Sequence, residues 1–152
     1  LELKKNGYKI ISVHLRRNIN KIIELVKKID EQQRNVHFVI LGSTEHDPLP
    51  NVPDFKSSTS LVDSYQKNIG TLELLAIARN SDLYIGGRGG FEYFFWLSEI
   101  PSINIFDDYG YFEKDCLMWP KMLWKNNEIK GPFSVHSPPN VLLDCFNKWF
   151  NK

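Results

Sequence analysis

The sequence predicts a single α/β domain of the Rossmann-like type, with a doubly wound and mainly parallel sheet formed by residues 1–152. Three observations lead to this fold class. Short β-branched runs alternate with segments of helical periodicity along most of the chain. A helical segment of 13 residues, 20–32, separates two of these runs, and a crossover of that length joins parallel strands. The length of 152 residues suffices for one hydrophobic core and is short for two.

The first strand–helix–strand unit is the clearest part of the pattern. Residues 8–14 form a short β-branched run bounded by Gly7, which is typical of a buried strand. In the segment 20–32 the apolar side chains recur at helical spacing, while lysines fall outside the apolar stripe. Val36–Leu41 is a second apolar run, and Gly42 ends it.

The second half of the chain continues the alternation. We expect Thr71 to be the N-cap of a helix over 72–79, with Glu73 in its positive first turn. The remaining expected elements are a short strand over 60–63, a strand over 82–85, a helix over 91–99, a strand over Ser102–Phe106, an aromatic loop region that includes Gly131 and Pro132, and a helix over 141–150. Ligands of such sheets bind beyond the carboxyl ends of the strands, so any site is expected among the residues that follow each strand.

Composition excludes several function classes. The formal net charge of +1 argues against a strong binder of nucleic acid or membrane surfaces, which carries concentrated basic charge. Two cysteines, 29 positions apart, favour neither a zinc site nor a disulfide framework, and they fit a reducing cytoplasm. The longest apolar stretch, 91–97, is too short to cross a bilayer, so we expect no transmembrane segment. No signal peptide opens the chain, and residues 1–5 lead almost at once into a strand, as if within a longer protein.

A glycine cluster between a strand and a helix is the strongest functional signal. Gly86, Gly87, Gly89 and Gly90 surround Arg88. Missing side chains let a ligand approach the backbone, and the free amides at the start of the following helix attract an anion such as a phosphate. The spacing is not that of the dinucleotide fingerprint. The structural alternative is a tight turn that needs glycine for positive φ angles.

The segment after the first strand carries the second signal. Strand alternation sends His14 and Arg16 to the same side, and Arg17 opens the turn. A guanidinium binds a diphosphate through two parallel hydrogen bonds, which a lysine does less well. The alternative is a pair of surface arginines beside a histidine of the core.

Other strand ends and chemical side chains leave more than one interpretation open. Gly42 and Ser43 follow the second strand, at the same edge as the two signals above. Glu92 is placed either to hold ribose hydroxyls or to offset the dipole of its helix. Asp107 and Asp108 are either loop residues or contacts for a sugar, and Trp119, Trp124 and Trp149 belong either to a domain interface or to a local core. His37 lies within a strand and is expected to be structural, whereas His46 and His136 are loop residues without visible partners.

Two stretches resemble glycosyltransferases. Residues 71–86 and 100–106 resemble the C-terminal domain of GT-B enzymes, most closely the heptosyltransferase type, in which a helix, a strand, a glycine turn, a helix, a proline and a strand follow one another. The spacing from Arg88 to Pro101 is similar to that family's spacing from glycine turn to proline. His14-Leu15-Arg16-Arg17 resembles the HxRR motif of fucosyltransferases that use GDP-fucose, in which an arginine holds the pyrophosphate. Together the resemblance covers roughly residues 8–110.

The resemblance implies that the chain is the donor-binding half of a GT-B glycosyltransferase, which binds a nucleoside diphosphate sugar for transfer to an acceptor. An N-terminal acceptor domain would then be missing, and we expect the isolated chain to be inactive. No metal or other cofactor is expected, because arginine and helix-start amides supply the charge for the diphosphate. The expected binding residues are His14, Arg16, Arg17, Gly42, Ser43, Gly87, Arg88, Gly89, Gly90 and Glu92, and no catalytic residue is assigned. Two alternatives remain: a nucleotide-sugar epimerase of the same fold, and a non-catalytic binding module.

Overall fold

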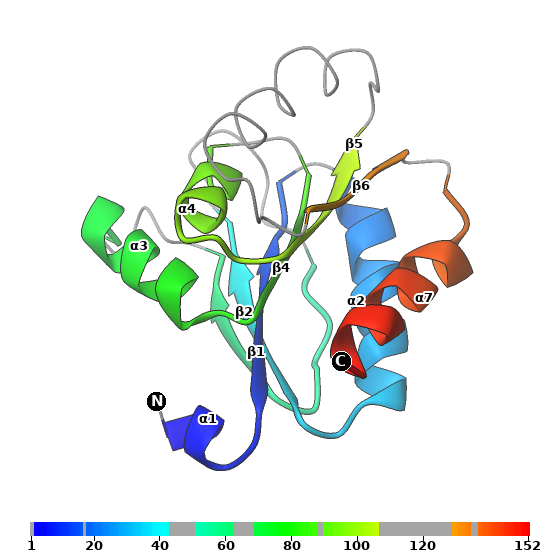
Figure 1. Ribbon diagram of the computed structural model, residues 1–152, viewed down its shortest axis with the longest axis horizontal. Coiled ribbons are helices and arrows are strands. Elements are labelled where there is room, and N and C mark those ends of the chain that lie inside the picture. Colours follow the sequence, from blue (N-terminus) through cyan, green and yellow to red (C-terminus); the bar gives the residue numbers. More distant parts are fainter. Residues whose placement is uncertain are drawn as a thin grey trace.

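The computed structural model describes residues 2–16, 18–42, 51–62, 69–87, 90–106, 129–134 and 137–152 (Figure 1). Within these ranges the chain forms one six-stranded sheet with helices on both sides. The elements in chain order are α1 (Glu2–Lys5), β1 (Lys9–His14), α2 (Ile19–Gln32), β2 (Val36–Leu41), β3 (Ser58–Leu61), α3 (Thr71–Asn80), β4 (Leu83–Gly86), α4 (Glu92–Leu97), β5 (Ser102–Phe106), β6 (Ile129–Ser134) and α7 (Pro139–Phe150).

The sheet order confirms the predicted fold class. The strands lie in the order β3-β2-β1-β4-β5-β6, and every neighbouring pair is parallel. This is the strand order of a Rossmann-like sheet. The order reverses between β1 and β4, where the chain begins to build the sheet in the opposite direction. Ligands of open α/β sheets bind at such a point, beyond the carboxyl ends of the two strands.

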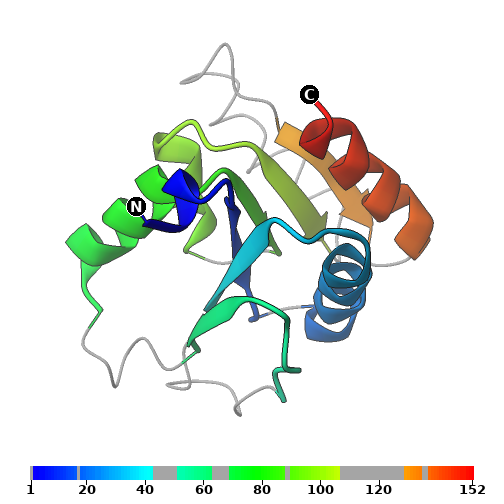
Figure 2. The same ribbon diagram turned by 90° about the horizontal axis from the view of Figure 1, so that it is seen from below.

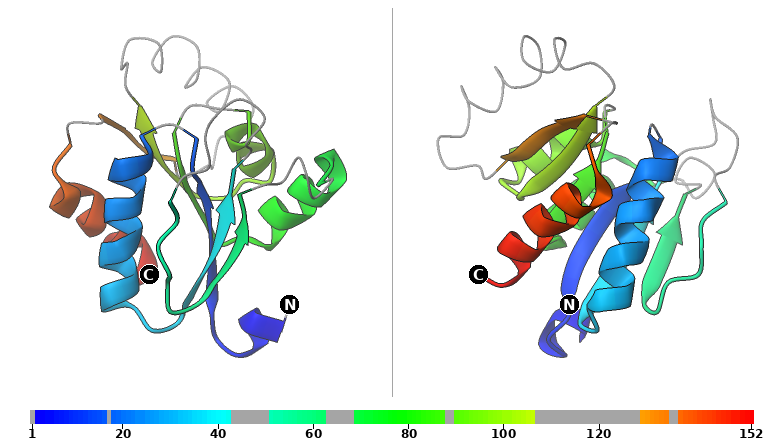
Figure 3. Two further views of the ribbon diagram at one scale, coloured as in Figure 1. Left: turned by 180° about the vertical axis from the view of Figure 1, so that it is seen from behind. Right: turned by 90° about the vertical axis from the view of Figure 1, so that its right-hand side faces the viewer.

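Helices cover the two faces in pairs. α2 and α7 pack side by side on one face, and α3 and α4 cover the other (Figures 1 and 2). The larger core lies under α2 and α7, where the inward side chains of α2 meet Val13 of β1, Ile105 of β5 and Phe146 of α7. Figure 3 shows these two helices side by side on the face that they share. The smaller core, under α3 and α4, is built around Tyr84 and Phe95.

The α3–α4 face of the sheet carries an unusual number of buried polar side chains. In the register of β1 with β4, Ser12 lies opposite Tyr84. In the register of β4 with β5, Tyr84 lies opposite Ser102, and Gly86 lies opposite Asn104. Residues paired in parallel strands point to the same face, and side chains two apart in one strand share a face. His14, two residues after Ser12, therefore lies on this face with them, and all of these polar residues are buried. They form a polar layer that leads to the carboxyl end of the sheet.

Several element bounds differ from the sequence predictions, each for a local reason. The N-cap of α3 is Gly70 and not Thr71. The Glu73 carboxylate accepts a hydrogen bond from the Gly70 backbone N–H at 3.1 Å, and this bond stabilises the helix start one residue earlier. The helix expected over 91–99 spans only Glu92–Leu97, and the left-handed Glu99 (φ 57°) ends its last turn.

Strand β3 lies two residues earlier than expected. Its polar residues give no apolar signal, and the hydroxyl groups of Ser57 and Thr59 instead hydrogen-bond the ring of His37 at 2.7 and 3.0 Å. His37 is thus structural, as predicted, and burial lowers its pKa.

Two elements were not foreseen. Residues 2–5 form a short helical turn, α1, before the first strand. The segment around Gly131 and Pro132, expected to be loop, contains strand β6. β6 is the outermost strand, and an edge position tolerates proline because the ladder does not need every amide.

Trp149 belongs to the core of this domain and not to an exposed interface. Only 8% of its surface is accessible, its ring lies 5.6 Å from that of Phe146, and the Lys9 ammonium lies 5.0 Å from its centroid. The other candidate tryptophans, Trp119 and Trp124, lie outside the described residues, as do His46, His136, Asp107 and Asp108.

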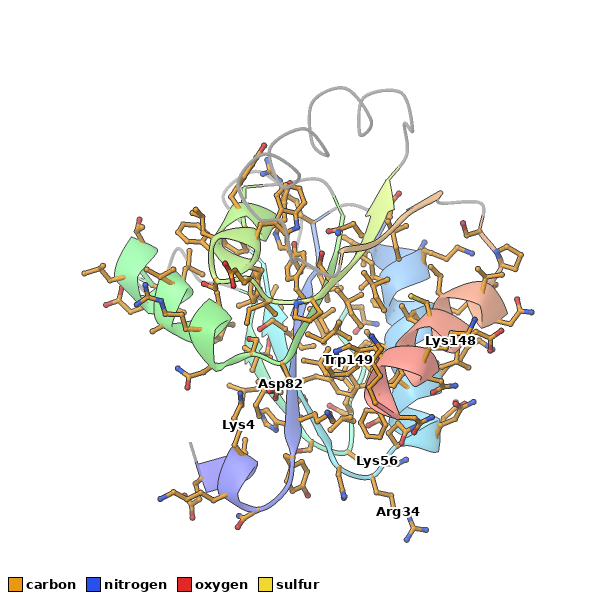
Figure 4. All side chains as sticks on the ribbon, in the orientation of Figure 1. Lys4, Arg34, Lys56, Asp82, Lys148 and Trp149 are labelled. Carbon is orange, nitrogen blue, oxygen red and sulfur yellow. The ribbon has the colours of Figure 1, made fainter. Side chains whose placement is uncertain are left out.

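Asp82, directly before β4, hydrogen-bonds to β1, and its replacement should lower the free energy of unfolding measurably. Its Oδ2 accepts the Ile10 amide at 2.7 Å, and its Oδ1 accepts a hydrogen bond from Lys4 Nζ at 2.9 Å (Figure 4). Asp82→Ala leaves the Ile10 amide without this acceptor and should lower the free energy of unfolding by about 1–3 kcal/mol. Lys4→Ala removes only a partly exposed ion pair and should cost about 0–1 kcal/mol. Urea denaturation of both variants checks the order, and equal losses would contradict it.

Candidate functional site

The two sequence motifs follow adjacent strands. β1 and β4 pair directly, with Val13 opposite Ile85, so the turn after His14 and the turn after Gly86 leave the same edge of the sheet side by side. β1 continues into α2 on one face and β4 into α4 on the other (Figure 1). The candidate site therefore coincides with the reversal of strand order.

Of the ten expected binding residues, six lie in the described ranges. Arg16 is exposed, Gly90 is exposed, and Gly87 is buried. His14 and Glu92 are buried, with 3% and 1% of their surfaces accessible. Gly42 is also buried, at the end of β2. Arg17, Ser43, Arg88 and Gly89 lie outside the described residues.

The turn between β1 and α2 is shaped by Asn18. Its backbone is left-handed (φ 55°, ψ 32°), a conformation that asparagine tolerates better than most residues. Its side chain makes no cap hydrogen bond to α2, and its Nδ2 instead donates to the carbonyl of Ile105 at the end of β5, at 3.3 Å. The first turn of α2 contains no acidic residue. The exposed Arg16 therefore precedes the positive end of this 14-residue helix by three residues. No carboxylate in the first turn of the helix offsets this positive end.

Gly86 is required by packing inside the protein. A Cβ atom placed on it would lie 2.6 Å from Cζ and 2.9 Å from Cε1 of Tyr84, whose ring occupies that space. Gly86 does not have a positive φ, and neither does Gly90. The tight-turn alternative is therefore wrong for these two glycines. Around Gly90 no atom would lie within 4 Å of an added Cβ, so nothing in the described part of the chain fills that space.

Gly42 also has a packing role. A Cβ there would lie 3.3 Å from the Val62 carbonyl oxygen and 3.5 Å from that of Leu15. The close approach that this glycine permits is therefore made by the protein's own backbone, just after the ends of β3 and β1.

Tyr84 joins the polar layer to the end of β1. Its hydroxyl lies 3.3 Å from Nδ1 of His14, and its ring stacks on Phe95 at 4.4 Å. The ring of His14 packs against Phe91 at 4.5 Å. Burial, helped by the charge of Arg16, lowers the pKa of His14 from 6.5 to about 4, so the imidazole is neutral at neutral pH.

Glu92 is the first residue of α4, and its side chain is buried. Burial, together with the charge of Glu92, raises the pKa of Tyr84 well above its usual value. The carboxylate is in the first turn of α4, as predicted, on a helix of only six residues.

The far side of the polar layer is formed by β5. Asn104 Nδ2 donates to Ser102 Oγ at 2.7 Å, and Trp96 Nε1 lies 3.4 Å from the same oxygen. The side-chain oxygen of Asn104 is buried and has no hydrogen-bond partner in the described part of the chain.

Sequence reasoning missed Tyr84, Asn104 and Asn18 as components of this region. For Tyr84 a signal was present. A tyrosine two residues before a glycine, in a strand buried on both faces, indicates a ring that lies over the glycine and a hydroxyl that needs a partner.

No known protein family matches this sequence, and no curated protein is significantly similar to it. Within the described ranges, no helix is long and apolar enough to cross a membrane. The same residues contain no group of three or more histidine, cysteine or acidic side chains arranged to hold a metal ion. The fold and the site geometry therefore carry the functional argument.

Proposed function

We propose that this chain is the donor-binding domain of a glycosyltransferase, and that it binds a nucleoside diphosphate sugar between the β1–α2 and β4–α4 turns. The observation that carries the proposal is the position of the two motifs. They follow the two adjacent strands at which the order of a Rossmann-like sheet reverses. Nucleotides bind at this point in sheets of this type.

The charge at this edge suits a diphosphate. Arg16 is exposed beside the start of α2, whose first amides carry partial positive charge and face no acidic residue of their own turn. Gly87 and Gly90 flank the second turn, and none of the described residues fills the space around Gly90. A guanidinium and helix-start amides supply hydrogen bonds to phosphate oxygens without a metal ion.

The same groups would assist transfer of the sugar. When the bond between the sugar and the diphosphate breaks, its electron pair remains on the diphosphate oxygen, and the acceptor hydroxyl forms the new bond. Arg16 and the α2 amides would stabilise the negative charge that develops on the departing diphosphate. The acceptor, and the base that takes its proton, would come from a second domain.

Removal of the Arg16 guanidinium should weaken diphosphate binding. A hydrogen bond to a charged group contributes about 1.5–3 kcal/mol, so Arg16→Ala should raise the Kd roughly ten- to hundredfold. Calorimetric titration of GDP, UDP and ADP into the protein measures this change.

Arg34→Ala is the matched control for this experiment. Arg34 is exposed like Arg16, but it lies at the end of the molecule where the strands begin (Figure 4). Its replacement should leave the Kd unchanged. Equal affinities of the unaltered protein, Arg16→Ala and Arg34→Ala would remove the site from this edge, and no binding of any of the three nucleotides would contradict the proposed function.

A further inference from the structure

The hydroxyl of Tyr84 is fully buried, and a buried hydroxyl requires a hydrogen-bond partner. Within the described part of the chain its partner is Nδ1 of His14, which lies 3.3 Å away. The two residues are 70 positions apart and come from the two strands that flank the candidate site. Their contact joins the ends of β1 and β4 within the polar layer.

The direction of this hydrogen bond follows from the need of the buried Tyr84 O–H for an acceptor, since Nδ1 of His14 is its partner in the described part of the chain. Burial raises the pKa of Tyr84, so its hydroxyl keeps its proton at neutral pH, whereas burial lowers the pKa of His14 and keeps the ring neutral. The hydroxyl hydrogen needs an acceptor, and the unprotonated nitrogen of a neutral imidazole provides one. If Nδ1 accepts, the single ring proton of His14 is on Nε2.

The surroundings hold the pair in place. Gly86 leaves the space that the end of the Tyr84 ring occupies, and Phe95 stacks against the same ring. Phe91 packs against His14 from the turn that leads into α4. Neither ring can move away without disturbing an aromatic contact.

We propose that Tyr84 is a positioning residue, which holds His14 in the tautomer with its proton on Nε2. His14 would then carry a neutral N–H at Nε2, two residues before Arg16, and this donor would serve an oxygen of the bound diphosphate sugar. The inference that the donor serves a ligand rests on the proposed function. Tyr84 itself does not touch the ligand and acts only through His14.

The tautomer can be measured without any ligand. Long-range proton–nitrogen correlation spectra of the imidazole distinguish protonation at Nε2 from protonation at Nδ1. We expect His14 of the unaltered protein to carry its proton on Nε2, and Tyr84→Phe to show a mixture of both tautomers. Tyr8→Phe, at the opposite end of β1, is the matched control and should leave the His14 signals unchanged.

Affinity provides a readout that a merely structural role would not move. Loss of one neutral hydrogen bond corresponds to roughly three- to tenfold in Kd, and Tyr84→Phe should weaken binding of GDP, UDP or ADP by that factor. If Tyr84 acts through His14, the same substitution should have no further effect in a His14→Ala background. Additive effects of the two substitutions would overturn the inference.

The outcomes separate this inference from the proposed function. A ring proton on Nδ1 in the unaltered protein, or an unchanged tautomer in Tyr84→Phe, would overturn the role of Tyr84 whether or not a nucleotide binds. If His14 has the expected tautomer but no diphosphate binds, the proposed function and the ligand role of His14 fail together, and the effect of Tyr84 on the His14 ring stands.

Discussion

Gly86→Ala is expected to lower the free energy of unfolding by about 3 kcal/mol, the upper end of the usual range for overpacking. The added methyl group would lie within 3 Å of two ring carbons of Tyr84. That ring is fully buried and stacked on Phe95, so it has no free direction in which to move. Thermal and urea denaturation of the variant measure the loss.

Two controls distinguish overpacking from a general intolerance of alanine in the glycine turn. Gly90→Ala adds the same methyl group where no atom of the described residues lies within 4 Å, and it should leave stability nearly unchanged. In a Tyr84→Ala background the space around residue 86 is open, so Gly86→Ala should cost much less than it does alone. A loss in Gly90→Ala as large as that in Gly86→Ala would contradict the packing explanation.

Acid should destabilise the protein through His14. In the unfolded chain the imidazole takes up a proton near pH 6.5, whereas in the folded protein burial, with the charge of Arg16, delays this to about pH 4. Between these values the unfolded state binds more protons, so stability falls as the pH drops from about 6.5 to about 4. The loss for this residue is roughly 3 kcal/mol over that window, and its contribution is constant above it.

Urea denaturation at a series of pH values from 7.5 to 4 checks this expectation. His14→Gln, which has no titrating ring, should have a flatter profile than the unaltered protein, and the difference between the two profiles isolates His14. His37 has a pKa lowered in the same direction and adds its own slope, so His37→Gln is the appropriate comparison. Parallel profiles of the unaltered protein and His14→Gln would show that burial does not suppress protonation of this ring.

The sequence by itself determined the fold class and most of the element positions. β-branched runs and amphipathic stripes are local patterns, and they located β2 and β5 at their observed bounds and β1, β4, α2 and α7 to within two residues. The 13-residue crossover indicated parallel strands, because tight turns cannot join them. From parallel strands it followed that the segments after His14 and after Ile85 would reach the same edge of the sheet. Strands β3 and β6 carry weak apolar signals, and their placement depended on pairing with a neighbour.

Only the tertiary structure decided which strands are neighbours and what fills the space between them. The adjacency of β1 and β4 brings Arg16 and the second turn to the same end of the sheet. It also brings the Tyr84 hydroxyl to His14, which lies 70 positions away in sequence. The tertiary structure also explains why residue 86 is a glycine, because the Tyr84 ring occupies the space that a ligand was expected to fill. Burial then determines the chemistry: His14 is neutral because the sheet, Phe91 and Arg16 surround it. Local sequence cannot specify such effects, because desolvation and close packing depend on contacts between distant parts of the chain.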